Sequence, residues 1–151
     1  MMTSVLSPVS GTVLPLSEVP DPVFAQAMVG PGVALKPVGG SADVIAPIAG
    51  VIVTLHPHAF VIAGESGTAV LVHLGIDTVQ RQGEGFALHV AKGDTVTAGQ
   101  SVVTWDPTEI EAVGFSSVCP VIVLEATEDQ LADLVVGSDV TAGDPLFTHQ
   151  S

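Results

Sequence analysis

The sequence has little positive charge. Three cationic residues, Lys36, Arg81 and Lys92, accompany sixteen acidic ones, and the formal net charge is −13. Nucleic acids and anionic lipid surfaces are bound by clustered Lys and Arg, so this composition excludes both as partners. It also argues against ATP as a phosphoryl donor, because there is no G-x-x-x-x-G-K-[ST] loop and few cations are present to hold a triphosphate.

Other features are scarce as well. No run approaches the roughly 20 apolar residues that cross a bilayer, and the first residues lack the basic and apolar regions of a secretory signal. The single cysteine, Cys119, cannot form an internal disulfide, which suits a reducing cytoplasm. We therefore expect one cytoplasmic domain over residues 1–151, with its core at about 7–148 and no direct membrane insertion.

Turn-forming residues are abundant. Sixteen Gly and eleven Pro separate short runs of Val, Ile, Leu and Thr, a pattern typical of many short strands. Two segments recur: residues 8–16 resemble 47–55, and residues 96–104 resemble 140–148. We predict an all-β fold, an antiparallel β-sandwich or barrel-like single domain with internal pseudo-repeats and only short helical turns.

Two stretches are expected to be helical. Residues 106–112 predict one short turn. Residues 128–135 predict two turns, because Leu131, Leu134 and Val135 share one face and Thr127 can cap the start.

Two histidines are predicted to face each other across a hairpin, since two apolar runs flank the turn sequence at residues 64–67. If Glu65 and Ser66 form a two-residue turn, His58 falls directly opposite His73, and their Cβ atoms lie roughly 4.5–5.5 Å apart. A bulge or a three-residue loop would break this register.

Such a pair fits three uses. One is phosphoryl transfer, with one His as nucleophile and the other as hydrogen-bond donor to the phosphoryl oxygens. Another is a zinc site, since His56 and His58 form an H-x-H motif, and His73 and Asp77 form an H-x-x-x-D motif. The third is purely structural. Residue types alone do not rank the first two uses.

A resemblance does rank them. The chain resembles the glucose-family IIA proteins of the bacterial phosphoenolpyruvate-dependent sugar phosphotransferase system, through motifs that occur in the same order over about residues 7–148. The matching segments are Pro8-Val-Ser-Gly11, Val19-Pro-Asp-Pro-Val-Phe-Ala25, Val29-Gly-Pro-Gly-Val-Ala34, Ala46-Pro-Ile-Ala-Gly50, His58-Ala-Phe60, Val72-His-Leu-Gly-Ile-Asp-Thr-Val79, Gly83-Glu-Gly-Phe86 and Gly93-Asp-Thr-Val96.

The resemblance implies a phosphotransferase that needs no cofactor. It accepts a phosphoryl group from phospho-HPr on His73, beside the phosphoryl-stabilising His58, and passes it to a cysteine in the IIB domain of a sugar permease of the glucose or N-acetylglucosamine class. A regulatory role, in which permeases or kinases read the phosphorylation state, is compatible with it. The alternative is a zinc-dependent hydrolase using the His/Asp cluster; a phosphocarrier requires no metal, although His58 and His73 could bind zinc.

The resemblance also implies that Asp21 and Asp77 meet an arginine of the donor. We expect a flat apolar docking surface beside them, composed of Phe60, Val72, Ile76 and Val79.

The remaining reactive residues receive structural interpretations. His56 is expected to be peripheral to the site, and His89 to be a surface or structural residue. His149 is expected to be disordered near the chain end. Cys119 stands in an apolar strand-like run with no cation nearby to lower its pKa, so we expect a buried structural thiol.

Overall fold

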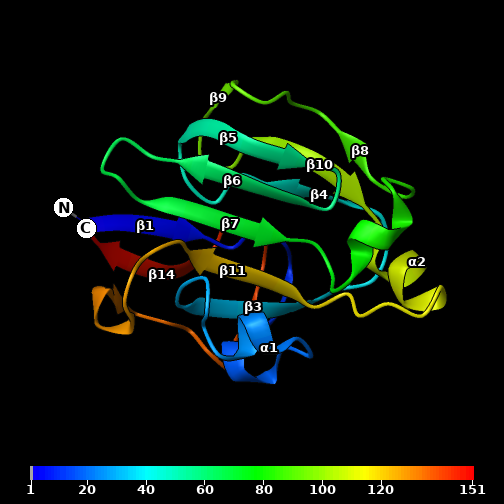
Figure 1. Ribbon diagram of the computed structural model, residues 1–151, viewed down its shortest axis with the longest axis horizontal. Helices are drawn as coiled ribbons and strands as arrows, with labels where there is room; N and C mark the ends of the chain where they lie inside the picture. The colour runs from blue at the N-terminus through cyan, green and yellow to red at the C-terminus, as the bar shows by residue number, and fades with distance from the viewer. Residues whose placement is uncertain (1) are drawn as a thin grey trace.

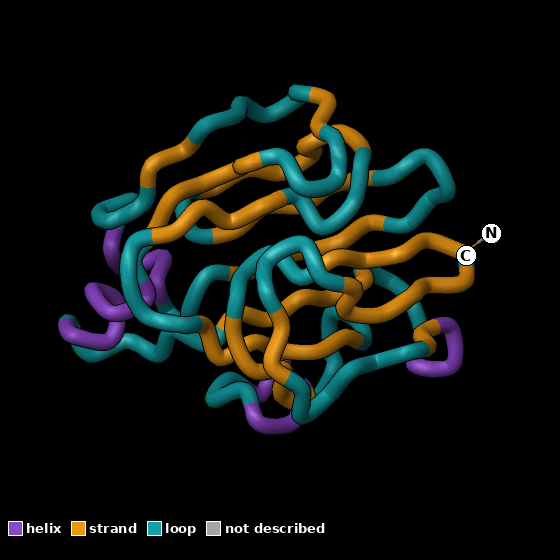
Figure 2. Tube along the Cα trace, turned by 180° about the vertical axis from the view of Figure 1, so that it is seen from behind, coloured by secondary structure: helices purple, strands orange, loops and turns teal. Residues whose placement is uncertain are grey.

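The structure, a computed structural model, describes residues 2–151. Its strands pair antiparallel in three sheets, ordered β1-β14-β12, β4-β10-β8 and β13-β2-β3-β11-β7-β6-β5-β9 (Figure 1). Seen from behind, the helical segments lie at the margins of the strands (Figure 2). The predicted antiparallel all-β fold with only short helical turns is confirmed.

The elements have these bounds. The strands are β1 (Met2–Leu6), β2 (Gly11–Pro15), β3 (Gly32–Pro37), β4 (Ala42–Ile45), β5 (Gly50–His56), β6 (Ala59–Ala63), β7 (Ala69–His73), β8 (Ala87–Leu88), β9 (Thr95–Val96), β10 (Ser101–Trp105), β11 (Cys119–Val123), β12 (Leu131–Ala132), β13 (Asp139–Val140) and β14 (Pro145–Gln150). The helical segments are the α-helices α1 (Pro22–Ala25) and α2 (Pro107–Ala112) and the 3₁₀ turns η1 (Leu16–Glu18), η2 (Thr78–Arg81) and η3 (Glu128–Gln130).

Strands β3 and β11 are buried on both faces. Successive side chains of a strand point to opposite faces of its sheet. On β3, Val33 and Leu35 join the main core, and Ala34 joins a smaller cluster with Leu16 and Phe24. The smaller cluster is the base on which η1 and α1 rest, and it fixes α1 near the end of the β6–β7 hairpin.

The repeated sequence units take equivalent positions in the fold. The Leu6 N–H donates to the Pro47 carbonyl over 2.9 Å, and the Ile45 N–H donates to the Pro8 carbonyl over 3.0 Å. The two related units at residues 8–16 and 47–55 hold β2 and most of β5. The two at residues 96–104 and 140–148 hold most of β10 and of β14. The repeats therefore build a pseudo-symmetric scaffold, as the sequence predicts.

The register of the β6–β7 hairpin differs from the prediction. The loop has three residues, 65–67, and its last residue, Gly67, has φ 87°. A left-handed Gly at this position is typical of three-residue hairpin loops. The pairing consequently shifts by one residue, so that Ala59, rather than His58, lies opposite His73.

One of the two expected helical stretches is also wrong. After the single turn η3, residues 131–132 form β12, in which Leu131 pairs with His149 and Ala132 with Thr148 of β14. The apolar spacing suits a helix, but pairing with β14 overrides it. The stretch at 106–112 is confirmed as α2, capped by the Asp106 carboxylate, which accepts from the Thr108 N–H over 2.9 Å.

Candidate functional site

His73 ends β7 with one ring nitrogen hydrogen-bonded and the other without a hydrogen bond to the part of the chain that the structure describes. Its Nδ1 lies 2.6 Å from the Gly75 carbonyl oxygen. Because a carbonyl oxygen only accepts, Nδ1 carries the proton and Nε2 keeps its lone pair. Gly75 has φ 81°, and a Cβ there would lie 2.6 Å from the Thr78 side chain and 2.8 Å from the Ser116 carbonyl oxygen. This glycine is thus required for the turn that orients the ring.

His58 reaches His73 from the turn between β5 and β6. Its carbonyl accepts from the Leu74 N–H over 2.7 Å, which fixes the turn against the end of β7. The two rings lie 5.2 Å apart between centroids, edge to face at 74°. The predicted contact between the imidazoles is confirmed, although the predicted register is not. A turn residue escapes the strict alternation of a strand, so His58 faces the same side as His73.

Other rings flank this pair. The Phe24 ring of α1 lies 5.1 Å from the His73 ring, and the His56 ring stacks on His58 at 5.7 Å with an angle of 24°. Four rings thus follow one another from α1 to the end of β5. His56 contacts the pair, whereas the sequence predicted a peripheral position for it.

Burial keeps both imidazoles of the pair neutral at pH 7. It lowers the pKa of His73, against the opposing effects of the Gly75 hydrogen bond and the Asp21 and Asp77 charges. It also lowers the pKa of His58 to about 4, assisted by the neighbouring His73 and His56 rings. A neutral His73 with a free Nε2 is the nucleophilic form of the side chain.

Two carboxylates lie close enough to act on His73. Asp21 caps α1 by accepting from the Val23 N–H over 2.9 Å. Asp77 precedes η2 with φ 62°, a left-handed conformation that is uncommon outside glycine. The fold brings both to the histidine pair, and their contact with a partner stays a prediction.

The predicted apolar docking surface is largely wrong. Phe60 and Val72 are 1% and 0% exposed in the main core, and Ile76 is 4% exposed beneath α1. Val79 is 60% exposed, as a docking residue must be. Sequence reasoning missed Val23, which is 41% exposed on α1. In the sequence, Asp21 followed by Pro22 indicates the start of a helical turn, and this pattern could have drawn attention to Val23.

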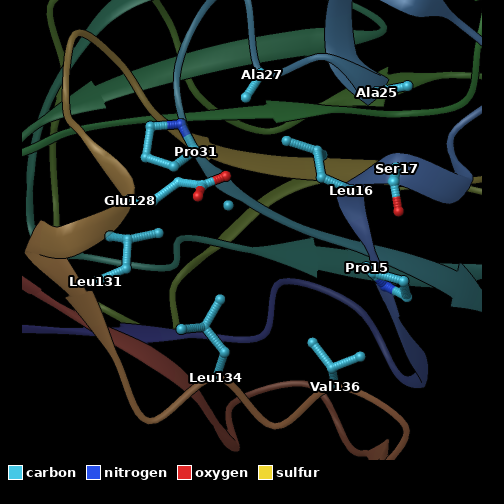
Figure 3. A pocket seen from close by; sticks show the side chains of 11 residues that line it. Pro15, Leu16, Ser17, Ala25, Ala27, Pro31, Glu128, Leu131, Leu134 and Val136 are labelled. Atoms are coloured by element: carbon cyan, nitrogen blue, oxygen red, sulfur yellow. The ribbon is translucent and has the colours of Figure 1, made fainter.

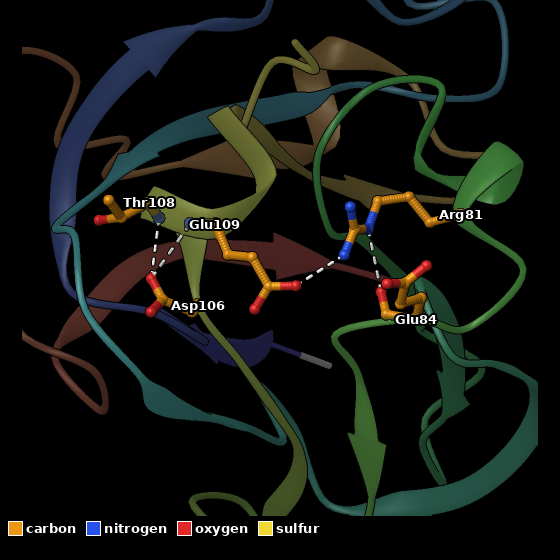
Figure 4. Close-up of polar contacts among 5 residues, drawn as sticks. All are labelled: Arg81, Glu84, Asp106, Thr108 and Glu109. Atoms are coloured by element: carbon orange, nitrogen blue, oxygen red, sulfur yellow. Dashed lines mark hydrogen bonds and ion pairs between the residues drawn. The ribbon is translucent and has the colours of Figure 1, made fainter. Parts of the chain in front are cut away.

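Sequence reasoning also missed Arg81, which anchors the segment after Asp77. Its guanidinium lies 2.7 Å from the Glu109 carboxylate of α2 and also donates to the Glu84 carbonyl over 3.0 Å (Figure 4). The Arg81 side chain is 7% exposed. A Cβ on Gly83 would lie 3.2 Å from the Pro57 side chain, so the anchored segment packs against the turn that carries His58.

The apolar pocket under α1 holds different chemistry. It measures about 350 Å³ and contains one carboxylate, Glu128, among mostly apolar side chains (Figure 3). No histidine lines it. Over residues 2–151, no group of three or more His, Cys, Asp or Glu side chains is placed to hold a metal. No helix in the same range has the length and apolar character needed to span a membrane.

The remaining reactive residues have mostly the predicted settings. His89 is exposed and bonds through Nε2 to the Thr104 hydroxyl over 2.6 Å. Cys119 is fully buried, and burial raises the pKa of its thiol. His149 is an exception: it lies in β14, is 5% exposed, and its Nδ1 is 2.8 Å from the Thr68 hydroxyl.

Comparison with known proteins places this site in a family. Residues 3–129 match the model of the phosphoenolpyruvate-dependent sugar phosphotransferase system, EIIA 1. The chain is 40% identical over 143 residues to the PTS system glucose-specific EIIA component of Oceanobacillus iheyensis, covering 93% of this chain and 86% of the relative. Glucose permease IIA from Mycoplasma capricolum has a similar structure, with a TM-score of 0.88, 35% identity, and coverage of 98% of this chain and 96% of that one.

A further relative has a different organisation. The PTS system glucose-specific EIIBCA component of Corynebacterium glutamicum is 39% identical over 127 residues, which are 84% of this chain and 19% of the relative.

Fold and relatives together define a phosphoryl carrier of a sugar-uptake system. The chain belongs to the EIIA 1 family of the phosphoenolpyruvate-dependent sugar phosphotransferase system. It is a phosphotransferase component that carries phosphoryl groups between proteins, and the fused relative implies a sugar permease as partner. The comparisons give no support to the zinc hydrolase.

Proposed function

We propose that His73 Nε2 is the atom that carries the phosphoryl group. It attacks the phosphorus of a phosphohistidine on HPr, so that an N–P bond forms at Nε2 as the donor's N–P bond breaks. A cysteine thiolate of a IIB domain then attacks the phosphoryl group on His73, so that an S–P bond forms as the N–P bond at Nε2 breaks. The observation that carries this proposal is the 2.6 Å contact of Nδ1 with the Gly75 carbonyl, since it leaves the lone pair on Nε2.

His58 is the second functional residue in this proposal. Its neutral ring lies 5.2 Å from the His73 ring and can donate one N–H to a phosphoryl oxygen. Phosphoryl transfer requires mainly positioning and charge stabilisation, and a phosphohistidine donor already supplies the transfer potential. The residues present are therefore sufficient without a cofactor.

Partner docking is proposed around the two carboxylates. Asp21 and Asp77 face His73 and can receive a cation from HPr, and the exposed Val23 and Val79 supply apolar contact beside them. Since this surface brings negative charge to the reaction, the partner must bring positive charge. We assign the protein to the cytoplasmic side of a permease of the glucose or N-acetylglucosamine class; the glucose-specific names of two relatives support the glucose part of this assignment.

Phosphoryl labelling tests the proposal. Incubation with phosphoenolpyruvate, the first enzyme of the system and HPr should give an acid-labile label on wild-type protein. The label should be absent from His73→Gln and unchanged in His89→Gln, a control that removes an exposed histidine just after β8, which belongs to a different sheet from β7. Normal labelling of His73→Gln would refute the assignment.

A further inference from the structure

A third imidazole extends the histidine pair toward solvent. His56 is the last residue of β5 and is exposed, and its ring stacks almost parallel on His58, with 5.7 Å between the centroids. His58 in turn meets His73 edge to face at 5.2 Å. The reactive ring is therefore connected to solvent through two successive imidazoles. The established carrier role and the proposed nucleophile leave His56 without a function.

Within residues 2–151, no Arg or Lys side chain is bonded to the histidine pair. A phosphoryl group on His73 would bring roughly two negative charges next to Asp21 and Asp77. Phosphoryl-transfer sites commonly offset such charge with Arg, Lys or a metal ion. Here Arg81 is paired with Glu109, and the two lysines lie on β3 and in the loop between β8 and β9. Over residues 2–151, no hydrogen bond or ion pair joins any of these three side chains to the His58 or His73 ring.

We propose that His56 and His58 act as a stacked pair that takes up one proton from water when His73 is phosphorylated, with His56 as the residue that positions His58 and shares the charge. This inference rests on the proposed phosphorylation of His73. The compensating charge then comes from a titrating pair and is present only while the phosphoryl group is bound. One proton is expected because two stacked imidazolium rings repel each other.

The arrangement explains why His58 alone is insufficient. Its ring is half-buried, and burial already opposes its protonation, as its lowered pKa shows. His56 is exposed, so water can solvate a charge on it and deliver the proton. A ring that stacks on the outer face of His58 also limits rotation of His58 away from His73.

The other charged groups around the pair are three carboxylates and one guanidinium. Asp77, Arg81 and Glu84 belong to the segment that packs against Pro57, and Asp21 faces His73 from the start of α1. Carboxyl and guanidinium groups as classes have reference pKa values outside the range from pH 6 to pH 8, whereas imidazole has its reference value inside it. A pH dependence in this window therefore arises from the imidazoles and from the phosphoryl group itself, which is common to wild type and variants.

The test is the pH profile of phosphoryl exchange with HPr. The equilibrium constant would be measured at pH 6 and pH 8 for wild type, His56→Gln, His56→Lys and His89→Gln. We expect the wild-type equilibrium to favour the phosphorylated chain more at pH 6 than at pH 8. In His56→Gln, the ratio of the equilibrium constants at pH 6 and pH 8 should be about three- to tenfold smaller than in wild type, which is the size of one charge interaction across a solvated site. His56→Lys should hold the favourable value at pH 8, and His89→Gln should match wild type.

A direct proton count gives a second readout. In weakly buffered solution near neutral pH, phosphorylation of His56→Gln should take up fewer protons than phosphorylation of wild type. Stacking alone would move neither this count nor the pH profile. If His56→Gln retains the wild-type profile while wild type is labelled on His73, this inference fails and the proposed function stands. If wild type is not labelled on His73, the proposed function itself fails.

Discussion

The β6–β7 hairpin has an imidazole at each of its two ends, and the two have opposite settings. At one end His73 offers a free Nε2 beside His58. At the loop end, near the chain termini in Figure 1, His149 bonds through Nδ1 to Thr68. Its Nε2 is buried without a hydrogen-bond partner in the described residues.

The difference shows that the surroundings of a histidine decide its role. Both side chains have one nitrogen engaged and lowered pKa values. The free nitrogen of His149 is enclosed by protein, so no partner can reach it. His73 is only partly buried, and Asp21 and Asp77 lie near enough to act on its charge, so a protein partner can approach it. His149 therefore supports the structure, whereas His73 is placed to react.

The largest effect that separates the two ends is expected from His58→Gln. The variant removes the imidazole facing His73 but changes no core residue. We expect the rate of onward phosphoryl transfer to fall by about a hundredfold, as when one preorganised donor to a developing charge is lost. Rapid-quench kinetics with a IIB domain would measure the rate. Transfer at the wild-type rate would show that His58 only adjoins the site.

Substitution at the loop end should affect stability instead. Thr68→Val removes the hydroxyl that bonds His149 and leaves both nitrogens of a buried ring unpaired. We expect a loss of about 2 kcal/mol in the free energy of unfolding, measured by urea denaturation, with the rate of phosphoryl transfer unchanged. The matched control is Thr54→Val on the exposed side of β5. If the two variants lose equal stability, the Thr68–His149 contact contributes nothing.

The sequence predicts the strands and the repeated units of this fold because those signals are local. The hairpin register is different: a two-residue turn and a three-residue loop both suit Gly64-Glu-Ser-Gly67, and only the left-handed Gly67 of the structure decides between them. The stretch after Thr127 fails for another reason. Its spacing fits a helix, and the residues of β14 that compete for it, His149 and Thr148, lie 18 and 16 positions beyond Leu131 and Ala132.

The site is predicted better than its surroundings. The contact between His58 and His73 follows from the hairpin and survives a shift of one residue. The docking surface could have been corrected from the sequence, because Val72 precedes His73 on a strand and must point to the opposite face. Phe60 pairs with Val72 and shares its buried face. The ion pair of Arg81 with Glu109 depends on tertiary packing, for which the sequence carries no local signal.

The smallest effect is expected on the folding stability at acidic pH. His58 should contribute to this loss down to a pH of about 4. The folded pKa values of His58, His73 and His149 all lie below the unfolded value, because burial disfavours imidazolium. The unfolded chain therefore binds more protons than the folded chain from about pH 7 downward. Stability must then fall as the pH drops through the unfolded pKa near 6.5, and for His58 the fall continues to about 4.

Between pH 7 and pH 5 we expect His58 to account for about 1 kcal/mol of lost stability, a value reduced for solvent screening of its half-exposed ring. Urea denaturation at the two pH values would measure the loss in wild type, His58→Gln and His89→Gln. The loss should shrink in His58→Gln and persist in His89→Gln, whose histidine is exposed. An equal loss in all three proteins would mean that the acid sensitivity arises elsewhere, with His149 as the next residue to test, because burial lowers its pKa as well.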